Sequence, residues 1–204
     1  AFLVGYIAGM TTKTNKVGFI GGMKNVIIDQ FQYGFEAGVL YAAKERNVPI
    51  EVVNQYAESF ADAAKGKAIA SSMYSGGCDI VFHAAGGVGY GVIEAAKDSN
   101  KFVIGVDRDQ SYLAPDNVLT SAVKNVGTAV KLVSRELMDG NQIGGRDYEF
   151  GLSEHCVGIP ENHKNMEESV YNKAMNLSKL VECGEIAVPF DEETFKIYKA
   201  DLTK

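Results

Sequence analysis

The chain has 204 residues, of which 46% are hydrophobic and 23% are charged, so it is long enough for one large domain or one and a half typical ones. Its formal net charge is −6 and its pI is about 5.1, whereas nucleic-acid-binding proteins usually carry a basic surface. No apolar run approaches the roughly 18 residues that cross a bilayer. The composition therefore disfavours nucleic-acid partners and membrane-spanning helices.

The first half of the chain alternates helical patterns with short apolar runs. Apolar residues spaced by three or four predict helices, and continuous runs of β-forming residues predict strands buried on both faces. The predicted helices span about 1–12, 27–46, 62–74 and 88–97, and the predicted strands span 17–20, 50–53, 79–84 and 101–106. Strands that alternate with helices in this way indicate an α/β fold with a doubly wound parallel sheet and flanking helices.

Beyond Gln110 the periodic pattern loosens. Pro115, Asp116 and Asn117 interrupt it, so a domain boundary is expected at 110–118. The later elements that we predict are a strand at 118–123, a helix at 126–137, an edge strand at 147–152, a polar helix at about 165–183 and a short amphipathic tail that ends at Lys204.

The three cysteines, Cys78, Cys156 and Cys183, are widely spaced and form no CxxC pair. This pattern predicts neither a zinc site nor a disulfide framework. We expect buried free thiols, because free cysteine packs like a small hydrophobic residue.

Polar residues follow directly after the apolar strand at 101–106, in the stretch Asp107, Arg108, Asp109 and Gln110. In open α/β sheets, ligands bind in the crevice beyond the carboxyl ends of the strands. Asp107 and Asp109 are therefore candidates for contact with a polar ligand. The alternative is that both aspartates only open a turn, where aspartate is common.

The glycine cluster at 84–91 has some features of a dinucleotide-binding turn. Gly87 and Gly89 fit the G-x-G-x-x-G pattern, but Val92 stands at its third glycine position and the cluster does not follow the first strand. Two interpretations stay open. The cluster either offers backbone N–H groups to polar ligand atoms at a helix N-terminus, or it is a tight turn without a ligand.

Catalytic patterns are weak in this sequence. No G-x-S-x-G occurs. His83 ends a strand without an evident partner, and His155 and His163 form only a loose metal-binding pattern. We therefore expect no catalytic residues, no metal, no cofactor and no enzyme activity.

Phe31 and Lys124 each have two interpretations. Phe31 falls on the apolar face of its helix, which favours core packing, yet it lies close enough to the carboxyl edge of the sheet to stack on a planar ligand. Lys124 follows the strand at 118–123 and is either a solvated charge or a partner of a ligand or of Asp107.

Several motifs in order resemble the basic membrane protein (BMP) family of bacterial lipoproteins, the PnrA-like purine-nucleoside receptors of ABC transporters. The likeness runs from residue 1 to about 140 and continues more loosely to the tail. The matching stretches are AFLVGYIAGMTTKTNKVGFIGGM, I-x-x-F-x-x-G-F-x-A-G from Ile28 to Gly38, SFADAAKGKAIASSMYSGGCDIVFHAAGGVGYGV, VIGVDRDQ, LTSAVKNVG and CGEIAVPF.

The resemblance implies two α/β lobes of the type I periplasmic-binding-protein kind that close on a ligand. A family member carries a lipoprotein signal and a first lobe before the position of Ala1, so we interpret the N-terminus as a cut through a longer protein. Residues 1–112 would form the second lobe, 113–142 would cross over to complete the first lobe, and 143–204 would return to the second lobe and form the tail. Such a fragment is expected to bind nucleosides weakly and to self-associate.

The resemblance also implies a ligand site. Phe31 resembles a stacking aromatic residue, Gly86 a backbone contact, Asp107 a carboxylate that grips ribose, and Lys124 a lysine near the ligand. The implied function is binding of purine nucleosides (guanosine, inosine, adenosine) for an ABC importer. Its partners would be permease and ATPase subunits, on the outer side of a cell membrane to which a lipid anchors the missing N-terminus. The alternatives are a nucleoside-sensing regulator of the same fold and, with less support, a nucleotide-dependent enzyme.

Overall fold

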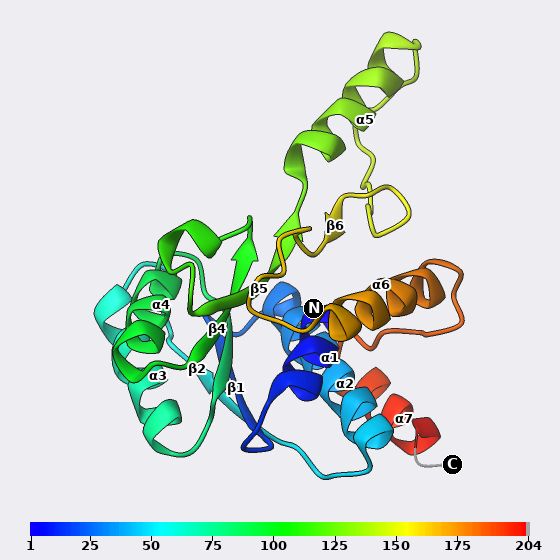
Figure 1. The fold of residues 1–204 in the computed structure, drawn as a ribbon. Helices are drawn as coiled ribbons and strands as arrows, with labels where there is room; N and C mark the ends of the chain where they lie inside the picture. The colour runs from blue at the N-terminus through cyan, green and yellow to red at the C-terminus, as the bar shows by residue number, and fades with distance from the viewer. Residues whose placement is uncertain (203–204) are drawn as a thin grey trace.

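The computed structural model describes residues 1–202 and has a six-stranded sheet at its centre (Figure 1). The strands lie in the order β2-β1-β3-β4-β5-β6, in which β1 to β5 pair in parallel and β6 pairs antiparallel with β5. Their bounds are β1 (Lys16–Gly21), β2 (Glu51–Tyr56), β3 (Ile80–Ala84), β4 (Phe102–Asp107), β5 (Val118–Lys124) and β6 (Val157–Gly158). The predicted doubly wound parallel sheet is confirmed.

Helices cover both faces of the sheet. One face packs on α1 (Phe2–Thr11), α2 (Val26–Arg46) and α6 (Glu168–Glu182), with α7 (Glu192–Leu202) against α2, and the other packs on α3 (Ala63–Ser75) and α4 (Val88–Ser99). Successive strand residues point to opposite faces, so Phe19 and Phe82 enter the first core while Ile20 and Val81 enter the second. Within residues 1–202, no helix is long and apolar enough to cross a membrane.

The helices α1 and α2 approach each other at glycines. A Cβ atom on Gly38 would lie 2.0 Å from the carbonyl oxygen of Phe2, and one on Gly5 would lie 2.1 Å from that of Phe35. Such close packing explains why α1 is buried nearly all round, the pattern expected of a core helix.

The helix α5 (Val126–Met138) differs from the others because it projects away from the body (Figure 1). None of its residues is buried. Its apolar side chains include Val126, Val130 and Leu137, which are 64%, 59% and 58% exposed. The helix predicted at 126–137 is confirmed, and its apolar stripe is not buried in the core of this chain.

The edge strand predicted at 147–152 is wrong. These residues form turns and irregular structure, and the strand that pairs with β5 is β6, where Gly158 lies opposite Val123. The alternation of Tyr148 and Phe150 misled the prediction, because these two rings stack on each other with centroids 5.8 Å apart. The side chains thus have a local partner that needs no strand.

All three cysteines are free. The expected burial is confirmed for Cys78 and Cys156, whereas Cys183 is exposed at the end of α6. The expectation was wrong for Cys183 because the last turn of α6 is largely solvent-facing, which apolar residue type alone does not reveal.

Candidate ligand-binding site

The carboxyl ends of the parallel strands meet at one edge of the sheet and form an open cleft of about 360 Å³. Phe31, Gly86, Asp107 and Lys124, which come from four different segments, all line this cleft. The full lining consists of Asn25, Ile27, Ile28, Phe31, Phe60, Ala84, Gly86, Val106, Asp107 and Lys124. The structure therefore brings together the four residues that the sequence singled out.

Phe31 is anchored by the core but remains part of the cleft. The side chain of Asn25 caps α2 by accepting hydrogen bonds from the N–H groups of Ile27 and Ile28, at 3.0 and 3.1 Å. This cap fixes the start of the helix. Phe31, one turn further on, tilts against Phe82 with ring centroids 6.2 Å apart and stays half-buried. Core packing of Phe31 is thus confirmed in part, and its place in the cleft lining leaves the stacking role as a prediction.

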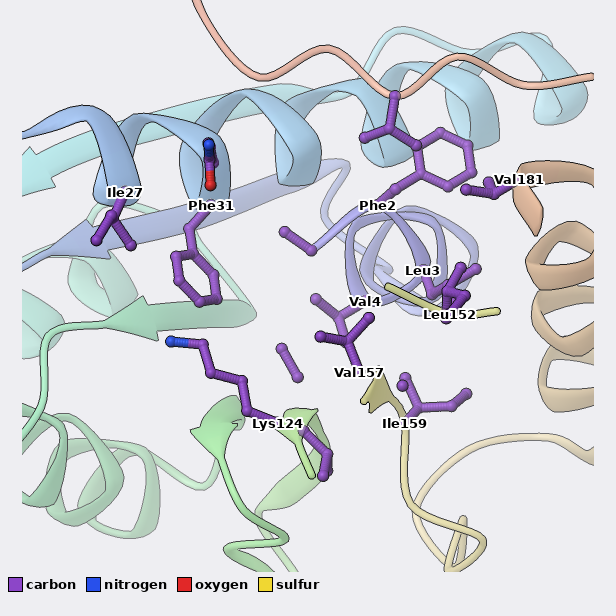
Figure 2. A pocket seen from close by; sticks show the side chains of 16 residues that line it. Phe2, Leu3, Val4, Ile27, Phe31, Lys124, Leu152, Val157, Ile159 and Val181 are labelled. Carbon is purple, nitrogen blue, oxygen red and sulfur yellow. The ribbon is translucent and has the colours of Figure 1, made fainter. Parts of the chain in front are cut away.

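Lys124 connects the carboxylate of Asp107 with the ring of Phe31. Its Nζ atom lies 3.1 Å from Asp107 Oδ1 and 4.7 Å from the centroid of the Phe31 ring. Figure 2 shows the lysine reaching toward this ring. The side chains of Lys124 and Asp107 are 41% and 57% exposed, so solvent still screens the ion pair. Lys124 is therefore a partner of Asp107.

Asp107 occupies a strained turn at the end of β4. Its φ is +67°, and the N–H of Arg108 donates to the carbonyl oxygen of Val106 at 2.8 Å. A hydrogen bond from residue i+2 to residue i around a positive φ defines the rare and strained form of the γ-turn. By contrast, Asp109 accepts from the N–H of Ser111 at 2.9 Å. The side chain of Asp109 thus stabilises the loop, while Asp107 turns the backbone and lines the cleft.

The glycine cluster forms a turn whose amides are already used. Gly86 has a φ of +56° and lines the cleft. The amides from Gly87 to Tyr90 donate within the protein, at 2.8–3.2 Å, to the carbonyl oxygens of Phe60, Ala85, Gly86 and Gly87. A phosphate cradle needs such amides to point at the ligand. This arrangement disfavours the dinucleotide interpretation.

Comparison with known proteins shows to which protein family the chain belongs. A family model described as "ABC transporter substrate-binding protein PnrA-like" (Bmp) matches residues 1–192. The chain belongs to the Bmp family. Its relatives include basic membrane protein A of Borreliella afzelii, 43% identical over 96% of this chain and 60% of that protein. Basic membrane protein B of Borreliella burgdorferi is 43% identical over 100% of this chain and 58% of that protein, so this chain spans about three-fifths of these relatives.

Solved structures share the fold of this Bmp-family chain. An ABC transporter solute-binding protein from Aeropyrum pernix matches with a TM-score of 0.83 at 23% identity, over 99% of this chain and 67% of that one. Another from Conexibacter woesei matches with a TM-score of 0.76 at 20% identity, over 94% and 63%. A transcriptional activator of the comK gene from Bacillus halodurans gives 0.73 at 24%, over 88% and 62%. The expected binding-protein fold is thereby confirmed.

A second aromatic residue of the Bmp-family cleft, Phe60, was missed in the sequence. It lies in the loop after β2, is 38% exposed and lines the cleft. A Cβ atom on Gly22 would lie 2.1 Å from its ring, so the missing side chain of Gly22 makes room for it. Gly22 was the signal that could have pointed to a bulky neighbour.

Two further hollows adjoin the cleft. An apolar one of about 270 Å³ shares Ile27, Phe31 and Lys124 with it and extends between α1 and β6 (Figure 2). A more polar one of about 310 Å³ shares Gly86 and Asp107 with it. The site therefore has an apolar side next to the Phe31 ring and a polar side next to the Asp107 carboxylate.

The histidines lie outside this arrangement. His163 places Nε2 2.6 Å from a carboxylate oxygen of Glu168 and stacks on Tyr171 with centroids 4.0 Å apart. His83 is completely buried beneath the cleft. Among the residues that the structure describes, no group of three or more histidine, cysteine, aspartate or glutamate side chains could hold a metal ion.

Proposed function

We propose that this Bmp-family chain forms the ligand-binding part of a substrate-binding protein that delivers purine nucleosides such as guanosine, inosine or adenosine to an ABC importer. The observation that carries the proposal is the contact of Lys124 with both Asp107 and Phe31 within one cleft. An aromatic ring can stack on the planar base of a nucleoside. A carboxylate can accept hydrogen bonds from its vicinal hydroxyls, and a lysine can balance the charge of that carboxylate.

Each side chain has a chemical role in this proposal. Phe31 stacks on the base, as aromatic rings do at offset geometry. The carboxylate of Asp107 accepts hydrogen bonds from the two ribose hydroxyls, and such charge-assisted bonds are about twice as strong as neutral ones. Gly86 supplies backbone contact, and Lys124 balances the charge of Asp107. No catalytic step is part of this function.

The division into lobes is also a proposal. Residues 1–112 form the second lobe, 113–142 lead across to the first lobe, and 143–204 return to the second. The exposed apolar stripe of α5 supports it, because an amphipathic helix normally buries that stripe against another surface. β5, also within 113–142, still belongs to the present sheet, so α5 is the part that reaches out.

The partners and the location follow from the importer role. We propose that permease and ATPase subunits receive the ligand, and that the protein works on the outer face of a cell membrane, held there by a lipid on its N-terminal region. No nucleic acid and no cofactor takes part. The family description as an ABC transporter substrate-binding protein supports the transport partners.

A nucleoside-sensing regulator is the second candidate. The likeness of the fold to a transcriptional activator keeps this candidate open. The N-terminal sequence of the full-length protein separates the two: a DNA-binding domain would favour the sensor, and a lipoprotein signal would favour the importer.

Calorimetric titration of the full-length protein with guanosine, adenosine, inosine and cytidine tests the proposal. We expect saturable binding of the three purine nucleosides and weaker binding of cytidine. Asp107→Ala should cost about 1.5–3 kcal/mol of binding free energy, the usual contribution of a hydrogen bond to a charged group. Absence of binding across the panel by a folded, ligand-free protein would refute the nucleoside proposal, and unchanged affinity of the variant would remove Asp107 from the site.

A further inference from the structure

A buried hydrogen-bond network lies directly beneath the polar side of the cleft. Its centre is Gln110, which is only 6% exposed. The Oε1 atom of Gln110 lies 3.0 Å from the N–H of Val106 and 3.0 Å from Nε2 of His83, and its backbone N–H donates to Oγ of Ser121 at 3.1 Å. The network therefore joins β3, β4 and β5 at the point where the ligand would bind.

The donors in this network follow from simple chemistry. The amide of Val106 can only donate, so the Gln110 atom that faces it is the oxygen. The same oxygen faces His83, so Nε2 of His83 carries the hydrogen and donates. Burial lowers the pKa of His83 to about 4, which keeps the ring neutral near pH 7. Its other nitrogen, Nδ1, has no partner among the described residues.

An unpaired buried acceptor is unfavourable, so stability alone does not explain a histidine here. The surrounding glycines nevertheless make room for it. A Cβ atom on Gly89 would lie 2.1 Å from the His83 ring. One on Gly105 would lie 2.5 Å from Oε1 of Gln110 and 2.6 Å from Oγ of Ser121. Gly89 and Gly105 thus leave the space that the side chains of His83, Gln110 and Ser121 occupy.

The network is attached to the strained turn of Asp107. The N–H of Val106 donates a hydrogen bond to Oε1 of Gln110. The carbonyl oxygen of Val106 accepts one from the N–H of Arg108, which closes the turn around Asp107. A non-glycine residue with positive φ persists only where its surroundings fix it. We propose that Gln110, held by His83 and Ser121, is a positioning residue that fixes the Asp107 turn and aims its carboxylate at the ribose of the ligand. The ribose part of this inference rests on the proposed function.

The test replaces Gln110 by methionine, which keeps the bulk and removes the acceptor. Gln32→Met is the matched control. Gln32 is similarly buried, at 8% exposed. Its side chain donates to Glu36 and accepts from the hydroxyl of Tyr56, and no hydrogen bond among the described residues joins it to the turn. If Gln110→Met does not fold, Ser121→Ala removes the smaller partner and is expected to act in the same direction.

Hydrogen exchange of the ligand-free, full-length variants provides the first readout. We expect faster exchange at the amides of Val106 and Arg108 in Gln110→Met and unchanged exchange there in Gln32→Met. Unchanged exchange at both amides in a folded Gln110→Met would overturn the inference, whether or not the protein binds nucleosides. This readout therefore separates failure of the turn from failure of the proposed ligand.

Titration with guanosine and with 2′,3′-dideoxyguanosine provides the second readout. Gln110→Met should weaken guanosine binding about tenfold or more, the range of one charge-assisted hydrogen bond, and leave dideoxyguanosine binding unchanged. A purely structural loss would affect both ligands alike, which would overturn the inference. If the wild type does not distinguish the two ligands, the proposed ribose contact fails, and the exchange result alone decides whether Gln110 fixes the turn.

Discussion

Replacement of Gly89 by alanine is expected to destabilise the protein. Gly89 is the second residue of α4 and packs directly against the buried ring of His83. The added Cβ atom would lie 2.1, 2.4 and 2.7 Å from three atoms of that ring. The ring lies between the sheet and α4 with no solvent-exposed surface, so either the helix or the ring must move, and movement of the ring breaks its bond to Gln110.

The expected magnitude combines three effects. Overpacking of a filled core costs about 1–3 kcal/mol, and loss of a hydrogen bond costs about 1 kcal/mol. Alanine recovers up to about 1 kcal/mol over glycine in a helix. We therefore expect the free energy of unfolding to fall by about 1–3 kcal/mol. At about 2–4 °C per kcal/mol for a chain of this size, the Tm should fall by roughly 2–12 °C.

Urea denaturation followed by circular dichroism measures the effect, and Gly127→Ala is the control. Gly127 is likewise the second residue of a helix, α5, but a Cβ atom there would meet nothing within 4 Å. That control should leave stability unchanged or raise it by up to about 1 kcal/mol. If both variants unfold at the midpoint of the wild type, the described packing of α4 on His83 is wrong. In a His83→Ala background, Gly89→Ala should cost less, because the two residues are in contact.

Two further predictions concern charged groups. Lys124→Gln should lower the free energy of unfolding by no more than about 1 kcal/mol, because both charges of its ion pair with Asp107 are exposed to solvent; a thermal shift above about 4 °C would contradict this. The hydrogen bond to Glu168 raises the pKa of His163 above 6.5, so their pairing stabilises the fold below that pH and is lost as the pH rises through the raised pKa. Stability measured from pH 6 to 9 should therefore decline less in His163→Asn than in the wild type, and identical profiles would refute the assignment.

Apolar patterns predicted most of the fold, because burial of the central strands on both faces requires apolar residues. The strands from β1 to β5 occur close to where the sequence placed them, although the edge strand β2 has no buried residue and continues beyond its apolar run to Tyr56. The segment from 147 to 152 failed for a physical reason. Alternating apolar residues indicate a strand only where a partner strand is available. Here the rings of Tyr148 and Phe150 stack on each other instead of packing against a neighbouring strand.

The site was predictable only in part. Phe31, Gly86, Asp107 and Lys124 could be placed near one sheet edge, because parallel strands end together. The remaining features depend on contacts between distant segments, which local patterns do not contain. The place of Phe60 beside Gly22 is one such contact, and the bond of His83 to Gln110 is another. The glycines that mark these contacts were visible, but glycine alone does not reveal which side chain needs the space.

The exposed ion pair bears on how the proposed receptor would close. Asp107 and Lys124 lie at an open edge where water solvates both charges. Closure of a first lobe over the empty cleft would remove that water, and the desolvation of two charges can exceed their mutual attraction. A ribose bound to Asp107 supplies hydrogen bonds that offset this loss. The ligand then binds the closed state better than the open one, which is the differential affinity that a ligand needs in order to shift a conformational equilibrium. In the proposed receptor, the ion pair would therefore disfavour closure without ligand and would couple closure to recognition of the sugar.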